Sequence, residues 1–519
     1  MPVSGAPLDR PVDVTDLLRR GLDGRPDAPA LVSRESRFTW RELHEASDRL
    51  AANLLGLGLK PRDRVASLMP NRCELDLHYI ACVKAGLVAT PLNYRYTAPE
   101  IDHALEVSGA SLLIAHAERD RDLAASKLVG RLPRGVIRYG AKDRQGPSFE
   151  SLVEREPAVR QLPRPDPSAP AFIFFTSGST GPAKGVTHSL ETIGWIVGSK
   201  MAGLSYTPDD AFLTGSSLSH AGGVGFTFAA LAAGARVVVA RTLDPSELLS
   251  LLREESPTVI WTLPALLIRL VRDHGAVGSD FSSLRVCSTG GDKASPELER
   301  EFAELTGFPI RECYGMTETG CTTMTPPTGV NKPGSIGLLS PGYTLSIRSE
   351  SGAELPHGAE GRMWISFPGN FIGYWNAPEA TAETFRDAWL DTGDVMKVDA
   401  DGYVWFCGRL KQIIVHDGSN ISPQEVEGAL LEHPAVESAG VIGVHDVIHG
   451  ENVYAYVTLR DSASRPTVQE LIEFARTRVG YKAPEMIFVL DEMPLNPVGK
   501  VDRTELKRMA AERCNGVMI

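Results

Sequence analysis

The sequence lacks long apolar stretches, paired cysteines and a targeting segment. No uninterrupted apolar run in its 519 residues reaches the roughly 18 residues that a membrane-spanning helix needs. Its seven cysteines are scattered, an odd number without paired spacing, which predicts reduced thiols and shows no pattern of a metal site. The first residues, MPVSGAPLDRPVD, lack the basic and apolar segments of a signal peptide. We therefore expect a cytoplasmic protein without a membrane span.

An excess of positive charge is also absent. The net charge is −12, with 53 lysines and arginines against 65 aspartates and glutamates. A nucleic-acid surface needs a basic face, so we expect no nucleic-acid partner. A polyanionic small ligand must then be bound by local lysines, arginines and backbone N–H groups. The hydrophobic content of 43% is typical of a globular protein, and the oligomeric state stays open.

The chain is longer than one hydrophobic core usually organises, which predicts at least two domains. In its first part, expected helices alternate with expected strands; the helices are 41–59 and 74–85, and the strands are 65–69, 88–92, 111–115, 171–175, 235–240, 259–263 and 284–289. This alternation is typical of a parallel, helix-covered sheet. From Gly334 to Phe406 shorter strands, including 344–348 and 361–366, indicate an antiparallel element.

After Gly408 the composition restarts as a compact unit with expected helices 423–432 and 467–479 and expected strands 439–444 and 452–459. The predicted fold class is therefore α/β. A large N-terminal domain, residues 1–408, would hold helix-covered sheets and the antiparallel element, and residues 409–519 would form a small mobile α+β domain. No Pro/Ser-rich spacer separates the two, which favours a tight hinge over a loose linker.

The stretch AFIFFTSGSTGPAKGVT, residues 171–187, combines an apolar strand with a loop suited to phosphate. Glycines let backbone N–H groups approach an anion closely, hydroxyls add donors and Lys184 adds a positive charge. The loop residues concerned are Thr176, Ser177, Gly178, Ser179, Thr180, Gly181 and Gly185. A plain surface loop is the simpler alternative, but the lysine and the preceding strand favour phosphate binding. A Walker A loop is excluded because Gly185 follows Lys184 where Ser or Thr is required.

Four further stretches carry residues suited to chemistry, each with a simpler structural explanation. SLSHAGGVGFTF places His220 before a glycine-rich segment, although a lone histidine is more often structural. YGMTETG sets Glu318 in a loop after a strand, where a solvated turn is the default interpretation. LDTGDV, residues 390–395, puts two carboxylates around a glycine turn, and it differs from the DKTG of cation-pumping ATPases in lacking lysine. NPVGKVDR places Lys500 in a glycine-containing turn, where a lysine is usually only exposed.

Together with GRLKQIIVHDGSNISPQEVE at 408–427, these stretches resemble the superfamily of adenylate-forming enzymes: acyl-CoA synthetases, adenylation domains of nonribosomal peptide synthetases and firefly-type luciferases. The resemblance covers nearly the entire chain, from VASLMPN near Val65 to NPVGKVDR, with the motifs in the family's order. No single motif is decisive, but the ordered set is specific. The resemblance implies two half-reactions: a carboxylate and ATP give an acyl-adenylate and pyrophosphate, and a thiol then displaces AMP.

The resemblance also implies a role for each candidate residue. The loop from Thr176 to Lys184 would hold the β- and γ-phosphates, Thr317 would touch the α-phosphate, and Glu318 would bind Mg²⁺. Lys500 would neutralise charge as the adenylate forms, and His220 would join the catalytic residues. The nucleotide contacts would come from Gly290, Gly291, Asp292, Glu312 and Tyr314 at the adenine, and from Asp394 and Arg409 at the ribose.

The small domain is implied to work in two orientations. A swing about Lys411 would replace Lys500 by the loop containing Gly418, which would line the channel for a pantetheine thiol. The chain departs from the family pattern in two places. Gln412 and Gly418-Ser419 stand where an acidic residue and a Gly-Gly pair are usual, and Gly290-Gly291-Asp292 replaces the usual GGA. These departures affect hinge polarity and adenine contacts but remove no charge needed for adenylation.

The second substrate is expected to be coenzyme A. Few residues follow Lys500, so we expect no fused carrier domain, and Tyr481-Lys482-Ala483-Pro484 resembles a segment common in CoA ligases. The small apolar segment after His220 favours a fatty or aryl monocarboxylate. One alternative is an enzyme that loads a free-standing carrier protein. The other, of a different class, is a non-catalytic nucleotide-binding protein, against which the presence of Lys500, Glu318 and Lys184 argues.

Overall fold

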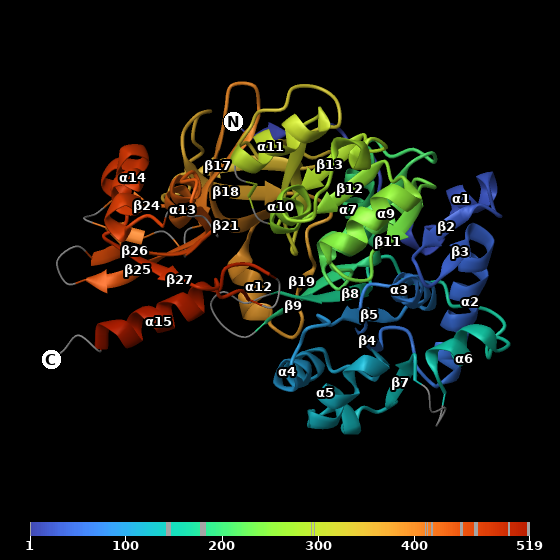
Figure 1. Ribbon diagram of the computed structural model, residues 1–519. Helices are drawn as coiled ribbons and strands as arrows, with labels where there is room; N and C mark the ends of the chain where they lie inside the picture. The colour runs from blue at the N-terminus through green and yellow to red at the C-terminus, as the bar shows by residue number, and fades with distance from the viewer. Residues whose placement is uncertain are drawn as a thin grey trace.

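The computed structural model of the protein describes residues 2–141, 147–176, 183–291, 293–294, 296–409, 412, 414–416, 419–446, 450–460, 465–496 and 499–515. In Figure 1 a large N-terminal part, coloured blue to light orange, lies beside a small C-terminal part, coloured dark orange to red. Sheets alternate with helical layers in the large part. The α/β architecture with a small C-terminal domain is therefore as predicted.

The first large sheet has a parallel centre and antiparallel edge strands. Its order is β19 (Gly373–Tyr374), β9 (Gly185–Ser189), β8 (Pro170–Phe175), β5 (Val88–Pro91), β4 (Arg64–Leu68), β6 (Leu112–His116) and β7 (Val136–Tyr139). Strand β9 pairs antiparallel with β8, and β19 pairs antiparallel with β9. The predicted phosphate loop therefore joins two antiparallel neighbours and does not open into a helix.

The second large sheet follows the same plan. Its order is β16 (Leu338–Leu339), β15 (Gly320–Met324), β14 (Ile310–Met316), β13 (Val286–Thr289), β12 (Val259–Thr262), β10 (Ala211–Gly215), β11 (Arg236–Val239), β2 (Pro29–Val32) and β3 (Arg37–Thr39). Strands β2 and β10–β14 pair in parallel, whereas β3, β15 and β16 pair antiparallel. Because β14 and β15 form a hairpin, the YGMTETG stretch is a strand end and a tight turn.

Helix α3 (Cys73–Ala85) contacts the first large sheet, α2 (Trp40–Gly56) and α8 (Ala221–Ala232) contact the second, and α7 (Leu190–Gly203) contacts both. The largest apolar core combines residues of both sheets with these helices. Helix α2 begins at a capping box in which Thr39 and Glu42 exchange hydrogen bonds, and α3 ends at Gly86, whose φ of 67° suits glycine. The predicted helices 41–59 and 74–85 are thus found with small differences at their ends.

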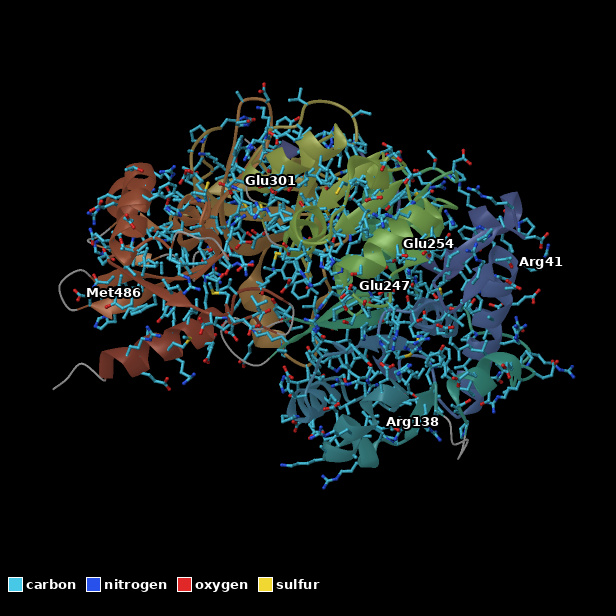
Figure 2. The ribbon with its side chains drawn as sticks, viewed as in Figure 1. Arg41, Arg138, Glu247, Glu254, Glu301 and Met486 are labelled. Carbon is cyan, nitrogen blue, oxygen red and sulfur yellow. The ribbon has the colours of Figure 1, made fainter. Side chains whose placement is uncertain are left out.

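The remaining helices of the large part lie on the outer faces of the sheets or in connections. They are α1 (Arg19–Gly24), α4 (Ala98–Ser108), α5 (Asp120–Ala125), α6 (Phe149–Glu154), α9 (Pro245–Glu255), α10 (Pro264–Arg272), α11 (Pro296–Thr306) and α12 (Pro378–Thr384). Arg41 on α2 and Glu254 on α9, both labelled in Figure 2, are exposed.

A third sheet is antiparallel throughout, as predicted for this region. Its strands are β1 (Val3–Ser4), β17 (Thr344–Arg348), β18 (Gly361–Ser366), β21 (Trp389–Val398) and β20 (Phe385–Arg386), with β22 (Val404–Arg409) also on β21. The LDTGDV stretch lies inside β21, so the predicted glycine turn is wrong. Pairing with β18 and β22 keeps the segment extended, and Gly393, with φ of 70°, absorbs a register shift.

The small domain is an α+β unit with its own apolar core. Its sheet runs β24 (Ser419–Ile421), β23 (Ile414–His416), β26 (Gly450–Leu459) and β25 (Val436–Asp446), with β27 (Met486–Leu490) parallel to β26. Its helices are α13 (Pro423–Leu431), α14 (Val468–Val479) and α15 (Arg503–Asn515). Met486, labelled in Figure 2, is 42% exposed on β27.

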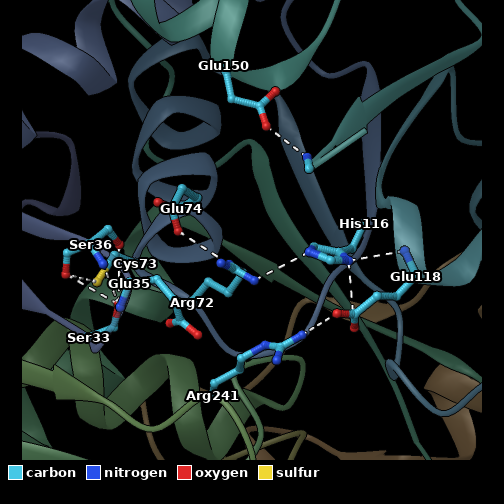
Figure 3. Close-up of polar contacts among 11 residues, drawn as sticks. Ser33, Glu35, Ser36, Arg72, Cys73, Glu74, His116, Glu118, Glu150 and Arg241 are labelled. Carbon is cyan, nitrogen blue, oxygen red and sulfur yellow. Dashed lines mark hydrogen bonds and ion pairs between the residues drawn. The ribbon is translucent and has the colours of Figure 1, made fainter. Parts of the chain in front are cut away.

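A polar cluster joins the carboxyl ends of strands from the two large sheets (Figure 3). Arg72, just after β4, lies 3.3 Å from the ring of His116 at the end of β6, and its Nε lies 3.7 Å from Glu74. Glu118 accepts from Arg241, which follows β11 of the other sheet. These contacts fix the two sheets relative to each other. In the part of the chain described above, no helix is both long and apolar enough to cross a membrane.

Candidate active site

The base of the predicted phosphate loop is closed by a backbone hydrogen bond. The N–H of Thr176, just after β8, donates to the carbonyl oxygen of Lys184, just before β9, over 3.2 Å. Lys184 is exposed, and its Nζ lies 4.9 Å from the centre of the Tyr374 ring on β19. The loop residues Ser177, Gly178, Ser179, Thr180 and Gly181 lie outside the described residues.

Glu318 occupies the turn between β14 and β15 and is only 6% exposed. The default interpretation of a solvated turn is therefore wrong for this residue. Its Oε1 accepts a hydrogen bond of 2.8 Å from the Tyr374 hydroxyl. Burial raises the pKa of the Glu318 carboxyl, and the Tyr374 hydrogen bond opposes this shift. Tyr374 thus touches Glu318 with its hydroxyl and Lys184 with its ring, which links two predicted site residues.

Thr317 is held by a histidine that the sequence motifs did not indicate. Nε2 of the buried His188, on β9, donates to the Thr317 carbonyl oxygen over 2.8 Å, and Nδ1 lies 3.1 Å from the Thr192 hydroxyl. Burial lowers the pKa of His188 to about 4, so the ring is neutral at physiological pH. This contact ties the β14–β15 turn of the second sheet to β9 of the first.

Asp394 lies at the centre of a second group and is fully buried. Arg409, its partner across β21 and β22, donates from Nε at 2.6 Å and from Nη2 at 3.3 Å. The hydroxyl of Tyr314, from β14, also donates to Asp394. Burial and the Asp394 charge raise the pKa of Tyr314, which stays a neutral donor. The structure therefore brings three predicted nucleotide-binding residues together from two sheets.

The predicted adenine-binding residues meet at the ends of β13 and β14. Thr289 and Glu312 are partners across these parallel strands, and Gly290 and Gly291 follow directly. A Cβ on Gly290 would lie 2.7 Å from Cys313 Sγ, so the position excludes any side chain. Glu312 is 4% exposed and accepts from the Ala294 N–H at 2.6 Å. Glu312 thereby braces the loop that follows β13, while Asp292 lies outside the described residues.

His220 and Lys500 come from the two domains and lie near each other. His220 precedes the first turn of α8. Burial and the nearby Lys500 charge lower the pKa of His220 to about 4. Lys500 is exposed at the end of a tight turn, in which its N–H donates to Asn496 Oδ1 at 3.0 Å and its carbonyl accepts from the Asn496 N–H at 2.7 Å. This domain arrangement presents the predicted adenylation lysine to the large domain.

The predicted hinge and channel residues belong to the segment that follows β22. Lys411 and Gly418 lie outside the described residues. Between them, the side chain of Gln412 accepts from Gln424 Nε2 at 3.1 Å, which ties the segment before β23 to the start of α13. The last residue of β22, Arg409, remains bonded to the large domain through Asp394.

The site offers separate positive and negative groups to a polyanionic ligand. Lys184, Arg409 and Lys500 carry positive charge, and Glu318 supplies a carboxylate beside the Thr317 turn. Among the residues that the structure describes, no three His, Cys, Asp or Glu side chains gather as a metal site. One carboxylate is nevertheless enough for Mg²⁺ when nucleotide phosphates supply other ligands. The donor set therefore fits a magnesium–nucleotide complex.

Sequence reasoning missed His188 and Tyr374, which contact the backbone or side chains of predicted residues. Both lie outside the motifs. They act across 129 and 56 positions of sequence, on Thr317 and Glu318 respectively. The aromatic residue after Gly373 and the histidine after the phosphate loop are single residues without a pattern of their own, so no local signal identified them.

Comparisons with known proteins place this geometry in context. The sequence profile of the family described as AMP-binding enzyme matches residues 18–375, and that of the AMP-binding enzyme C-terminal domain matches residues 425–500. A feruloyl-CoA synthase of Amycolatopsis sp is 35% identical over 495 residues, which cover 93% of this chain and 96% of that protein.

Two further similarities cover nearly the whole chain. The fatty acid–[acyl-carrier-protein] ligase ScoC of Streptomyces coeruleorubidus is 31% identical over 503 residues, which cover 93% of each protein. The crystal structure of the anthranilate CoA ligase AuaEII in complex with anthranoyl-AMP has a TM-score of 0.89 at 26% identity, and the match covers 98% of this chain and 99% of that one.

Proposed function

The chain belongs to the family of AMP-binding, adenylate-forming enzymes, as its motifs predicted, and we propose that it is an AMP-forming ligase that joins a fatty or aryl monocarboxylate to coenzyme A. The observation that supports this proposal is that Lys500 of the small domain lies near His220 of the large domain, which also holds the linked groups Lys184–Tyr374–Glu318 and Asp394–Arg409. A protein that only binds a nucleotide has no need of a lysine delivered from a second domain.

In the first half-reaction the carboxylate oxygen attacks the α-phosphorus of ATP, and the bond to the pyrophosphate oxygen breaks. Negative charge moves onto pyrophosphate, so electrostatic stabilisation is the main requirement. Lys184 and the hydroxyls of its loop hold the β- and γ-phosphates, and the Thr317 hydroxyl contacts the α-phosphate. Glu318 would hold Mg²⁺, which would supply positive charge to offset the charge of the phosphates. Tyr374 and His188 position Glu318 and Thr317 for these contacts.

The nucleoside is bound by the buried carboxylate group. Asp394 is already oriented by Arg409 and Tyr314, so its remaining lone pairs accept from the two ribose hydroxyls without reorganisation. Glu312 and the glycines after β13 frame the adenine. Each of these groups belongs to the large domain or to its last strand. Nucleotide binding therefore persists when the small domain moves.

Lys500 acts only in the adenylation step. Its ammonium group contacts the substrate carboxylate and the bridging oxygen, where it offsets the charge that accumulates in the transition state. His220, kept neutral by burial and by Lys500, borders the carboxylate without adding a second positive charge. In the second half-reaction the CoA thiol attacks the acyl carbonyl and AMP leaves. Rotation at Lys411 removes Lys500 and brings the loop of Gly418 to the thiol channel.

A carrier protein is the alternative acceptor. The relative ScoC is named as a fatty acid–[acyl-carrier-protein] ligase and is 31% identical, so this outcome has a specific observation in its favour. The feruloyl-CoA and anthranilate–CoA relatives favour coenzyme A and aryl acids instead. Because both acceptors end in the same pantetheine thiol, the adenylation residues are the same in either case.

The deciding experiment combines the protein with ATP, Mg²⁺ and a panel of fatty and aryl acids. Each reaction is run alone, with CoA and with a phosphopantetheinylated carrier protein, and pyrophosphate, acyl-AMP and thioester are measured. We expect acid-dependent pyrophosphate release and acyl-CoA. Lys507→Ala, at an exposed lysine of α15, is the control for Lys500→Ala. Thioester on the carrier alone supports the alternative, and no AMP with any acid supports a non-catalytic nucleotide-binding protein.

A further inference from the structure

Lys200 is a buried lysine for which the described part of the chain provides no ion-pair partner. It lies on α7, and the residue is 1% exposed. Its Nζ has one hydrogen-bond acceptor, the Gly222 carbonyl oxygen at 3.5 Å, and it lies 4.1 Å from the centre of the Phe226 ring. The thiols of Cys313 and Cys321 are its other polar neighbours, and thiols are weak acceptors. Burial lowers the pKa of the Lys200 amino group, and its N–H donors are poorly satisfied by these neighbours.

A second buried lysine shows how the same protein normally compensates such a charge. Lys84, on α3, is 9% exposed and donates to Asp48 Oδ1 at 2.7 Å and to the Ser47 hydroxyl at 2.8 Å. A carboxylate and a hydroxyl thus accept from Lys84 at normal distances. No comparable pair of acceptors is recorded for Lys200 among the described residues. A ligand oxygen at Lys200 Nζ would supply an acceptor of the kind that Lys84 finds in Asp48 and Ser47.

The Lys200 amino group occupies the space that a side chain at Gly225 would fill. A Cβ on Gly225 would lie 2.5 Å from Nζ, and a Cβ on Gly222 would lie 3.0 Å from the Trp261 ring. Any larger residue at Gly225 would displace the lysine. The glycines of the first turns of α8, which the sequence shows only as a small apolar segment, therefore admit a charged group from α7.

Two stacked aromatic rings lie beside the Lys200 amino group. Phe226 and Trp261 stack with their centres 4.9 Å apart, and the indole N–H of Trp261 donates to Cys313 Sγ at 3.1 Å. Trp261 is 8% exposed, and Gly222 beside it is partly exposed. Flat, apolar side chains with one cation at their end suit an aromatic ring that carries an oxygen.

Lys200 also lies close to the candidate active site. Its acceptor Gly222 is two residues after His220, which faces Lys500. Its charge contributes to lowering the pKa of His188, the residue that donates to the Thr317 carbonyl oxygen. An acid whose carboxylate lies at His220 and Lys500 would extend along the first turn of α8 toward the Lys200 amino group.

We propose that Lys200 is a specificity-determining residue that donates a hydrogen bond to a phenolic oxygen on the ring of an aryl acid substrate. This inference rests on the proposed ligase function and names the class of acid. A site built to hydrogen-bond a substrate oxygen rejects the analogue that lacks it, because the buried donor is then left unpaired. We expect the wild-type protein to favour the hydroxylated acid by at least about tenfold in kcat/KM.

The test uses pairs of acids that differ in one ring hydroxyl, 4-hydroxybenzoate with benzoate and 4-hydroxycinnamate with cinnamate. Acyl-CoA formation is measured for the wild type, Lys200→Met and Lys84→Met. Methionine keeps the length of the chain and removes the charge, so a folded protein is expected. The preference for the hydroxylated acid should fall at least about tenfold in Lys200→Met, mainly through KM, and should keep its wild-type value in Lys84→Met.

The outcomes separate this inference from the proposed function. Acyl-CoA formation with the same hydroxyl preference in wild type and Lys200→Met would overturn the role of Lys200 and leave the ligase function intact. An equal loss with both members of each pair would mean a structural role and would also overturn it. A Lys200-dependent preference for aliphatic dicarboxylates would overturn the phenolic class. Absence of acyl-AMP with every acid would refute the ligase function itself.

Discussion

Replacing Tyr374 by phenylalanine removes one hydroxyl and tests how Glu318 is prepared for Mg²⁺. The hydroxyl donates to Glu318 Oε1 at 2.8 Å, and the ring lies beneath Lys184. Phenylalanine keeps the ring, so the Lys184 contact survives. Glu318 is 6% exposed, so water has little access to replace the lost donor. The variant therefore perturbs a single hydrogen bond to a single carboxylate.

The expected size of the effect follows from that contact. A hydrogen bond to a charged group contributes about 1.5–3 kcal/mol, which is roughly a 10- to 150-fold change in an equilibrium constant. Outer partners of metal-binding carboxylates typically change metal affinity by about 10- to 100-fold. We therefore expect the Mg²⁺ concentration for half-maximal adenylation to rise by about 10- to 100-fold.

The effect should depend on pH in one direction. Burial raises the pKa of Glu318 and the Tyr374 hydroxyl lowers it, so the variant has the higher pKa. A higher pKa leaves more of the carboxyl protonated at a given pH, and Mg²⁺ must displace that proton. The difference between variant and wild type should therefore widen as pH falls and narrow as pH rises.

The assay is carboxylate-dependent ATP–pyrophosphate exchange, titrated with Mg²⁺ at about pH 6 and about pH 8. Tyr403→Phe is the matched control, because Tyr403, like Tyr374, has a lysine near its ring: Lys332 Nζ lies 4.7 Å from the ring centre. The Tyr403 hydroxyl donates to the Val330 carbonyl oxygen and not to Glu318. An unchanged Mg²⁺ requirement in Tyr374→Phe, or a shift equal at both pH values, would refute the assignment of Glu318 as the metal-binding carboxylate.

Three further predictions concern the other parts of the site. Lys500→Ala should slow adenylation by about 100-fold or more while thioester formation from supplied acyl-AMP survives; equal loss of both steps would contradict a role confined to adenylation. Lys411→Pro, which fixes φ and removes a backbone donor, should form acyl-AMP but fail in its consumption by CoA, with circular dichroism to confirm folding; a normal thioester rate would contradict the two-orientation mechanism. The pKa of His188 is about 4 in the folded protein and ordinarily 6.5. Between about pH 4 and about pH 6.5 the unfolded chain therefore binds more protons at this residue than the folded protein does, so the free energy of unfolding should decrease as the pH falls through that range. Thermal unfolding of the wild type and of His188→Gln at about pH 5 and about pH 7.5 measures this loss of stability. An identical pH dependence of the two proteins would contradict the contribution of His188.

The sequence was sufficient where local patterns decide structure. The periodic apolar residues of α2 and the apolar runs of β8 and β12 each formed the predicted element, because burial of one face or of a whole strand follows from the pattern itself. The strand β9 was not expected, since GVTHS has neither a long apolar run nor a strict alternation. Its pairing with β8 and β19 makes it a strand.

The candidate site was predictable only in its motifs. The family resemblance indicated Glu318, Asp394 and Lys500, but not what holds them. Asp394 illustrates the limit: LDTGDV reads as a turn, whereas pairing between β18 and β22 keeps it in a strand and places its carboxylate against Arg409 and Tyr314. Such contacts join positions 15 and 80 residues apart, and no local spacing encodes them.

The contacts of Asp394 also limit where the domain rotation can begin. Arg409 ends β22, and its guanidinium is the cationic partner of a fully buried carboxylate. Carrying Arg409 away with the small domain would leave the Asp394 charge uncompensated, which costs roughly 3–5 kcal/mol for a buried pair. The cost here lies toward the lower end of that range, because the Arg409 side chain is 41% exposed. The rotation is less costly if it begins after Arg409, where Lys411 is proposed to act. The small domain can then withdraw Lys500 while Asp394, the carboxylate proposed to bind the ribose, keeps both Arg409 and Tyr314 as partners.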